Sequence, residues 1–169
     1  NIFCEAEQSL AKPIDEQIAW ITGSQVCYCA EAFQGVSREH PDAPALSVLA
    51  TVLRNGFLHT AIREKGGAYG AGATNDTSTN TFKFFSYRDP KCTETFTAFK
   101  DAIKWSKTSI TDQHLEEAIL GVVSSIDKPL SPVGEAKNDF NFNLEDISIK
   151  ERLEMRQRVI NCSIEDLIR

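Results

Sequence analysis

Hydrophobic and polar positions change their spacing twice along the first third of the chain. Residues 25–33, QVCYCAEAF, are rich in residue types that favour strands and follow a glycine turn signal, which predicts a strand. After the prolines of residues 40–44, apolar positions recur three and four residues apart, and this spacing predicts a helix that ends near Arg63: Leu46, Leu49, Leu53 and Phe57. Gly56 within this helix is either a break or a point of close packing, and the pattern leaves both open.

The next segments have strand and turn character. Residues 69–74 and 81–87 predict two strands, joined by a polar hairpin loop at residues 75–80. The first of these strands is rich in glycine, which leaves room for another backbone to lie alongside. It is therefore also a candidate edge for pairing with an extended peptide.

Helical spacing dominates the second half of the chain. One helix is predicted around residues 96–103, where the apolar positions again lie three and four apart. A second helix follows the cap residue Thr111 and stops before Pro129. A third runs from the capping-box residue Ser148 to about Val159.

This order of a strand, a helix, two strands and then helices predicts an α+β fold in which helices pack on one face of a single sheet. The chain has 169 residues, enough for one core, so residues 1–169 are expected to form a single domain. Residues 129–146 are expected to form a loop, since they hold two prolines, a glycine and several asparagines. The chain starts at Asn1 and stops in the first turn of a predicted helix, so we expect a piece of a longer polypeptide.

Composition narrows the classes of partner. Acidic residues outnumber basic residues by 24 to 18, which gives a formal net charge of -6. Nucleic-acid binding is not expected, because phosphate contacts need a surplus of basic residues. A membrane partner is not expected either, since no apolar run approaches the roughly 20 residues of a membrane span and no signal-peptide pattern opens the chain. The sequence therefore predicts a soluble protein.

The five cysteines are an odd-numbered set without regular spacing, which predicts thiols that are mostly reduced and buried: Cys4, Cys27, Cys29, Cys92 and Cys162. Strand alternation places the sulfur atoms of Cys27 and Cys29 on one face of the first strand. A metal site there would need a second pair of ligands, so we interpret both residues as core. Reduced thiols favour a reducing compartment, either the cytoplasm or an organelle matrix.

Local motifs for metal and phosphate chemistry are incomplete. His114-Leu-Glu-Glu117 begins like the zinc signature H-x-x-E-H, but position 118 is alanine, so we interpret these residues as the cap and surface of a helix. His59 lacks an acidic or histidine partner four residues away, and His40 lies in a loop. The stretch KGGAYG does not match a phosphate loop, in which the lysine follows the glycines. No metal ligand is therefore assigned within the chain.

Arg63 and Tyr69 remain as candidates for chemistry, in the stretch IREKGGAYGAGA of residues 62–73. One interpretation is structural: a helix ends in basic residues and a glycine, and Tyr69 fills the sheet. The other is functional: a turn at Gly66 and Gly67 brings both side chains to one target. The guanidinium supplies a permanent charge, and the phenol supplies one directional donor for a developing oxyanion. The residues alone leave both interpretations open.

The run LRNGFLHTAIREKGGAYG, residues 53–70, closely resembles the C-terminal half of pitrilysin/insulinase-family zinc metallopeptidases, especially the presequence-protease branch. The arginine, the glycine pair, the tyrosine and the preceding helix all match together. The order of elements is similar over about residues 17–169. In that family two halves close around a peptide. The resemblance implies one domain of that fold here, and a parent protein that degrades or processes short unstructured peptides.

The resemblance also implies roles for individual residues. In the family, the zinc ion, its H-x-x-E-H motif and a downstream glutamate lie in the N-terminal half, while the C-terminal half supplies an arginine and a tyrosine. Tyr69 would therefore hydrogen-bond the scissile carbonyl group as it becomes tetrahedral, and Arg63 would hold the neighbouring substrate backbone. The turn residues around them are expected to bind substrate: Gly66, Gly67, Ala68 and Gly70.

The same resemblance implies what this chain lacks. The helix of residues 45–63 has neither the paired histidines nor the glutamate of the zinc motif, as in the non-catalytic domains of the family. This chain alone is therefore expected to be inactive, with zinc bound by the N-terminal half of the same polypeptide. The expected partners are that half and a peptide substrate.

Two alternatives stay open. If the other half also lacked the zinc motif, the whole protein would be a non-catalytic scaffold or assembly member of the family. Retention of both Arg63 and Tyr69 favours the peptidase over the scaffold. The second alternative is a peptide-binding module that uses the glycine-rich strand edge.

Overall fold

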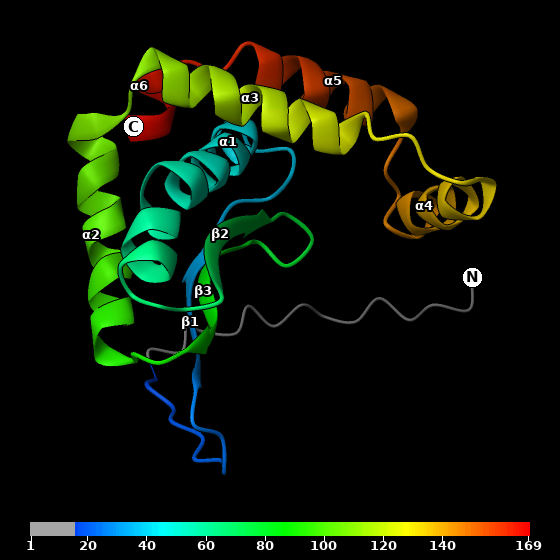
Figure 1. Ribbon diagram of the computed structural model, residues 1–169. Coiled ribbons are helices and arrows are strands. Elements are labelled where there is room, and N and C mark those ends of the chain that lie inside the picture. The colour runs from blue at the N-terminus through cyan, green and yellow to red at the C-terminus, as the bar shows by residue number, and fades with distance from the viewer. Residues whose placement is uncertain (1–15) are drawn as a thin grey trace.

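The computed structural model describes residues 16–169 and combines a small sheet with a group of helices (Figure 1). The sheet contains β1 (Cys27–Gln34), β2 (Gly70–Asp76) and β3 (Thr81–Asp89). One continuous helical segment precedes β2 and consists of α1 (Ala43–Leu53) and the π-helix η1 (Arg54–Glu64). The remaining helices follow β3: α2 (Thr93–Ser109), α3 (Asp112–Ile126), α4 (Pro132–Leu144), α5 (Ile149–Ile160) and α6 (Ile164–Ile168). The predicted α+β fold is confirmed.

The three strands form an antiparallel sheet in the order β1-β3-β2, so β3 is central. Strand alternation gives β3 two different faces. Phe82, Phe84 and Ser86 are buried on the face that packs against the helices. Tyr87, two residues beyond Phe85 on the other face, is exposed. Helices therefore cover one face of the described sheet, as the order of elements predicts.

Aromatic rings join the sheet to α2. The Phe84 ring stacks on Phe99 of α2 at 5.4 Å between centroids and meets the edge of Phe82 at 5.5 Å. Phe84 and Phe99 are both fully buried. A second buried cluster lies between α1, α3 and the C-terminal helices and is made of aliphatic side chains: Ala45, Val48, Val52, Ala118, Val159 and Leu167. The helix α1 contributes to both clusters, so it ties the sheet to the helical layer.

The helix predicted to end near Arg63 is confirmed, but its second half is a π-helix of 11 residues. Gly56 within it is a point of close packing, because a Cβ atom at this position would lie 2.6 Å from the Trp105 ring. The continuous helix is 22 residues long and, by length and composition alone, is apolar enough to cross a membrane. The core helix of a soluble protein meets the same criterion, and the buried residues of this helix pack against the sheet and α3.

The expectation of a loop at residues 129–146 is wrong, because the structure forms α4 there. Ser131 accepts a hydrogen bond from the Gly134 N–H, and Pro132 occupies the first turn, where its missing N–H is not needed. None of the α4 residues is buried. The prolines, the glycine and the asparagines of this segment indicated a loop, but a proline in the first turn does not interrupt a helix.

The described cysteines are all free, as expected for reduced thiols. Cys29 is buried, and Cys27 and Cys162 are half-buried. Cys92 is exposed, so the prediction of burial is wrong for this residue. Cys4 lies outside the described residues.

Substitution of Phe84 tests the aromatic packing between the sheet and α2. We expect Phe84→Ala to lower the free energy of unfolding by about 3–5 kcal/mol, because it removes a fully buried ring and leaves a cavity. Phe85→Ala is the matched control, since Phe85 is only half-buried and points to the other face. Urea unfolding of the two variants should show a clearly smaller loss for the control. Equal losses would contradict the assignment of the core to the Phe84 face.

Candidate functional site

The turn between η1 and β2 is closed by backbone hydrogen bonds and two glycines. The Gly67 N–H donates to the Arg63 carbonyl oxygen at 3.0 Å, and the Ala68 N–H donates to the Ile62 carbonyl oxygen at 3.1 Å. Gly67 has a φ angle of 89°, a left-handed conformation that favours glycine. A Cβ atom on Gly66 would lie 2.3 Å from the Ile62 carbonyl oxygen. Both positions of this turn therefore require glycine.

Arg63 lies in the last turn of η1 with its side chain exposed. Its guanidinium Nη1 lies 3.4 Å from His59 Nε2, and His59 Nδ1 lies 3.3 Å from a carboxylate oxygen of Glu64. His59 and Glu64 are five residues apart, and the π-helical turn with its i→i+5 hydrogen bonds brings them to one side. This arrangement suits an imidazole that donates from Nδ1 to Glu64 and accepts at Nε2 from Arg63. His59 thus has an acidic partner that i+4 spacing did not predict.

Tyr69 lies on the other side of the turn, just before β2, and its side chain is 62% exposed. The Tyr69 N–H donates to the Arg88 carbonyl oxygen at 3.2 Å, which ties its backbone to the end of β3. The Tyr69 ring packs against Tyr87 with 5.7 Å between centroids. The Arg88 guanidinium lies 5.7 Å from the centre of the Tyr69 ring, within the range of a cation–π contact. Neighbouring side chains therefore restrain a ring that remains open to solvent.

Gly70 allows Tyr87 to pack across β2. The two residues are paired between β2 and β3, and a Cβ atom on Gly70 would lie 2.5 Å from the Tyr87 ring. Tyr87 fills the space above Gly70 and supports Tyr69 beside it. Sequence reasoning did not assign a role to Tyr87 or Arg88. The sequence did contain a signal for Tyr87. When the two predicted strands are paired across their hairpin loop, Tyr87 falls opposite Gly70 and next to Tyr69.

A buried carboxylate fixes the segment that follows β3. Asp89 is completely buried, and its Oδ2 atom accepts hydrogen bonds of 2.7 Å from the hydroxyl groups of Ser86 and Thr95. Its Oδ1 atom accepts from the Lys91 N–H at 2.9 Å. These three bonds join the end of β3 to the first turn of α2. Because Arg88 is the adjacent residue, the same network holds the backbone partner of Tyr69 in place.

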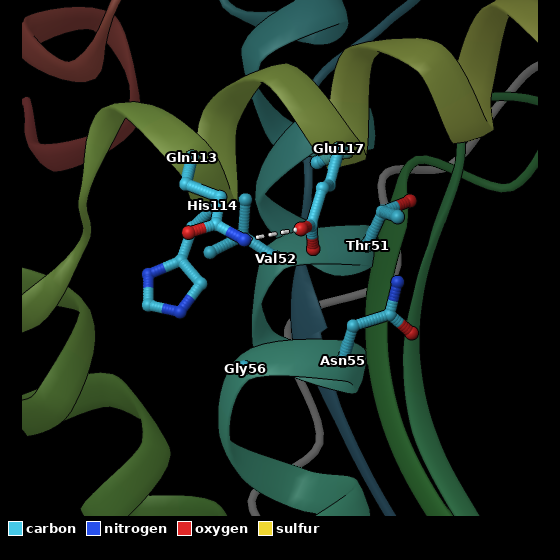
Figure 2. Close-up of a pocket in the computed structure, with 8 residues that line it drawn as sticks. Thr51, Val52, Asn55, Gly56, Gln113, His114 and Glu117 are labelled. Atoms are coloured by element: carbon cyan, nitrogen blue, oxygen red, sulfur yellow. Dashed lines mark hydrogen bonds between the residues drawn. The ribbon is translucent and has the colours of Figure 1, made fainter.

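One cavity lies beside this turn and a larger one lies away from it. A shallow depression of about 110 Å³ lies between η1 and the start of α2, lined by Gly66, Lys65 and Lys91 among others. A larger cavity of about 220 Å³ separates α1 and η1 from α3 (Figure 2). Its polar lining includes Gln113, which donates to Glu117 at 2.8 Å. The larger cavity includes none of the turn residues from Arg63 to Gly70.

The incomplete zinc signature on α3 has a structural role. His114 completes the capping box of this helix, because its Nδ1 atom accepts from the Thr111 N–H at 3.2 Å. Its ring also meets the edge of Trp105 at 5.3 Å. The interpretation of His114 as a helix cap is confirmed. Across residues 16–169, no group of three or more histidine, cysteine or acidic side chains is placed to hold a metal ion, so these residues do not fit a zinc site.

Solved structures with the same fold include inactive peptidase domains, one described as part of a zinc protease and one as part of an M16 peptidase. The inactive peptidase domain of a zinc protease from Bordetella parapertussis matches with a TM-score of 0.70 and 15% identity, over 83% of this chain and 81% of that chain. A peptidase M16 inactive domain from Pseudomonas fluorescens matches with a TM-score of 0.63 and 17% identity, over 83% and 35%. At these identities the likeness shows the fold alone.

Sequence comparison identifies the family within this class. The model of the PreP C-terminal domain matches residues 19–169. The mitochondrial presequence protease of Eremothecium gossypii is 40% identical over 147 residues, which cover 86% of this chain and 14% of that protein. This chain therefore belongs to the PreP C-terminal domain family, and the resemblance to the presequence-protease branch is confirmed. The chain spans about 14% of the length of the curated relatives that it matches.

Alanine substitution tests the glycine requirement of the turn. We expect Gly66→Ala to lower the free energy of unfolding by about 1–3 kcal/mol, because the new methyl group overlaps the Ile62 carbonyl oxygen and forces the backbone to move. Gly121→Ala in α3 is the control, since its Cβ atom would meet only Thr51 Cγ2 at 3.6 Å. The control should be neutral or stabilising by up to ~1 kcal/mol, as expected for alanine in a helix. Unchanged stability of Gly66→Ala in urea unfolding would contradict the described turn.

Proposed function

We propose that this chain is the non-zinc C-terminal-half domain of a zinc metalloendopeptidase that degrades or processes short unstructured peptides. The observation that carries the proposal is the presentation of Arg63 and Tyr69. Both side chains are exposed, and they flank a turn whose two glycines and two backbone hydrogen bonds fix its path. Family membership supplies the reaction class, since the curated relatives are presequence proteases. In this proposal the domain comprises about residues 17–169.

Tyr69 would supply the hydrogen bond that stabilises the transition state. Its hydroxyl group donates to the scissile carbonyl oxygen as that oxygen becomes negative, and a preorganised donor of this kind acts most strongly in the transition state. The contacts with Tyr87 and Arg88 restrain the ring before substrate arrives. Tyr69 is therefore expected to raise the rate of the chemical step rather than the affinity for substrate.

Arg63 would hold the substrate backbone beside the cleaved bond. A guanidinium offers several donors in a fixed plane, which suits carbonyl and carboxylate groups. His59 accepts from one of these donors, and the Arg63 side chain is exposed, so we assign its other donors to the substrate. His59 is therefore a positioning residue for Arg63, and Glu64 in turn orients His59.

The turn residues would contribute shape to the substrate site. The N–H groups of Gly67 and Ala68 already donate to carbonyl oxygens within the turn, so they are not free donors for a substrate. Ala68 and Gly70 are buried, whereas Gly67 is exposed. We assign direct contact with peptide to Gly67, and close packing beneath it to Gly66, Ala68 and Gly70.

Zinc in this proposal belongs to the N-terminal half of the same polypeptide. The described residues do not fit a metal site, so the isolated chain would bind no catalytic zinc and would be inactive. The relatives carry the word mitochondrial in their names, which supports an organelle matrix as the location. That location agrees with the free thiols of the described cysteines.

An exposed apolar surface on α4 and α5 supports contact with the rest of the polypeptide. Figure 1 shows α4 beyond the ends of α3 and α5, away from the sheet. Five large apolar side chains on these two helices are more than half exposed: Val133, Phe140, Leu144, Ile149 and Leu153. Apolar surface of this extent commonly marks an interaction site. We assign its occupant to the remaining part of the longer chain, since the relatives are about seven times longer than the matched segment.

A peptide-binding module is the second candidate function. Its support is the position of β2, which is an edge strand of the described sheet and has small side chains at its start. An extended peptide would add to that edge through main-chain hydrogen bonds. Measurable affinity of the isolated chain for a short peptide would favour the module, because a split peptidase site predicts weak binding by one half alone.

Removal of the Tyr69 hydroxyl tests the proposed role. We expect Tyr69→Phe in the full-length protein to lower kcat/KM for a short unstructured peptide by about 10²–10³-fold, the usual effect of losing one oxyanion donor. Most of the loss should be in kcat, because the ring and its packing against Tyr87 are kept. Tyr28→Phe is the control, since it removes an exposed tyrosine hydroxyl on β1 and should leave turnover unchanged. Unchanged turnover of Tyr69→Phe would count against the proposed role.

A further inference from the structure

Two free cysteines from distant parts of the chain meet at the edge of the core. Cys29 on β1 is buried, with 4% of its surface exposed, and Cys92 directly before α2 is exposed. Their sulfur atoms lie 4.0 Å apart. Residues between them include the whole of α1, η1, β2 and β3. The contact is therefore built by the tertiary fold and not by proximity in sequence.

The geometry of β1 and of the Asp89 network brings the thiols together. β1 pairs with β3 so that Cys29 lies opposite Ser86, which faces the helices and donates to Asp89. Asp89 also accepts from the Lys91 N–H and from Thr95, which turns the chain sharply between β3 and α2. Cys92 lies within this turn and is thereby directed back over β1. Both partners of the thiol pair are positioned by contacts that exist without any covalent bond.

We propose that Cys29 and Cys92 form a reversible disulfide when the protein meets a peroxide. A disulfide has a sulfur–sulfur distance of ~2.05 Å, so the two sulfur atoms must move about 2 Å closer together than their 4.0 Å separation in the reduced protein. Cys92 is exposed and follows the strand end, so its side chain has room to rotate toward Cys29. This inference does not depend on the proposed peptidase activity.

The reaction proceeds in two balanced steps with hydrogen peroxide as the oxidant. The Cys92 thiolate attacks one peroxide oxygen, the O–O bond breaks, and a sulfenic acid and hydroxide form. The Cys29 sulfur then attacks the Cys92 sulfur, the S–O bond breaks, and the departing hydroxide takes a proton to leave as water. Two thiols and one peroxide molecule thus give one disulfide and two water molecules, and a dithiol reductant reverses the change.

Exposure assigns the order of these steps. Peroxide reaches Cys92 from solvent, whereas the core covers Cys29. Desolvation raises the pKa of the Cys29 thiol to about 11, so at neutral pH this sulfur is protonated and reacts poorly with a dissolved oxidant. Cys29 is therefore the resolving thiol, which reacts only with the neighbouring sulfenic acid.

Cys27 is the competing partner on the same strand. It lies two residues before Cys29 and is half-buried. Desolvation by burial and the nearby Cys92 thiol both raise the pKa of the Cys27 thiol. The 4.0 Å sulfur–sulfur contact favours Cys29 as the partner of Cys92, but the Cys27 thiol also interacts with Cys92, so the experiment must separate the two products.

The bond would act on the segment that supports Tyr69. Arg88 lies four residues before Cys92, and its carbonyl oxygen accepts a hydrogen bond from the Tyr69 N–H. Pro90, in the same segment, lies so close to Gly67 that a Cβ atom on Gly67 would be 3.4 Å from its ring. Oxidation joins this segment covalently to β1. It therefore restrains the backbone on which the turn at Gly67 and Tyr69 rests.

Peptide mapping of the full-length protein tests the proposal. The reduced protein is treated with hydrogen peroxide, remaining thiols are blocked with iodoacetamide, and chymotrypsin is used because cleavage after Tyr28 separates Cys27 from Cys29. Mass spectrometry should show a peptide pair linked through Cys29 and Cys92, which disappears after treatment with dithiothreitol. Cys92→Ser should abolish the linked pair. Cys162→Ser is the matched control and should retain it, since Cys162 lies near the end of α5 and not beside Cys92.

Three results would overturn the proposal. The first is full alkylation of both thiols after peroxide treatment. The second is conversion of Cys92 to sulfinic or sulfonic acid without any linked peptide. The third is a product in which Cys27 rather than Cys29 is linked to Cys92, and Cys27→Ala would then remove the linked pair. Under the proposal, Cys27→Ala leaves the link between Cys29 and Cys92 in place.

Discussion

The turn at Gly66 and Gly67 is the constraint on which the arrangement of the candidate site depends. The chain must leave a π-helix and enter β2 within a few residues, and the Ile62 and Arg63 carbonyl groups accept the hydrogen bonds that close this turn. A side chain at Gly66 would overlap one of these carbonyl oxygens, and Gly67 adopts a left-handed backbone conformation. The same geometry fixes where Arg63 leaves the helix and where Tyr69 enters the sheet.

The central strand β3 connects this turn to the core. Its buried face carries Phe84, which stacks on α2, and its other face carries Tyr87, which packs over Gly70 and against Tyr69. At the end of the strand, Asp89 binds Ser86 and Thr95 and so joins the sheet to α2. The support of Tyr69 and the stability of the domain therefore share one strand. A change in the packing of β3 is expected to affect both.

Much of the fold follows from local pattern. Apolar spacing predicted the long helix that ends near Arg63, and the polar tract at residues 75–80 predicted the hairpin that joins β2 and β3. The helix α4 was missed because the prolines, the glycine and the asparagines of residues 129–146 indicate a loop, although Pro132 lies in the first turn of the helix, where proline is tolerated. The π-helical character of η1 was missed because apolar spacing does not distinguish a π-helix from an α-helix. The contact between His59 and Glu64 depends on the π-helical turn, so it was missed as well.

The candidate site was only partly predictable. Composition and spacing did not decide whether Arg63 and Tyr69 have a structural or a functional role. The resemblance to a peptidase family favoured the functional role. Tyr87 and Arg88 could not be selected from local pattern, since their contacts with Tyr69 depend on the register between β2 and β3. The contact between Cys29 and Cys92 likewise requires the tertiary fold.

The central claim is that this chain completes a peptidase site whose metal lies elsewhere in the same protein. The most direct measurement compares zinc content and cleavage of a short unstructured basic peptide by the full-length gene product and by residues 1–169 alone. The account predicts bound zinc and cleavage in the full-length protein, with neither in the isolated chain. Absence of zinc and cleavage from both would contradict the account and identify a non-catalytic scaffold member of the family.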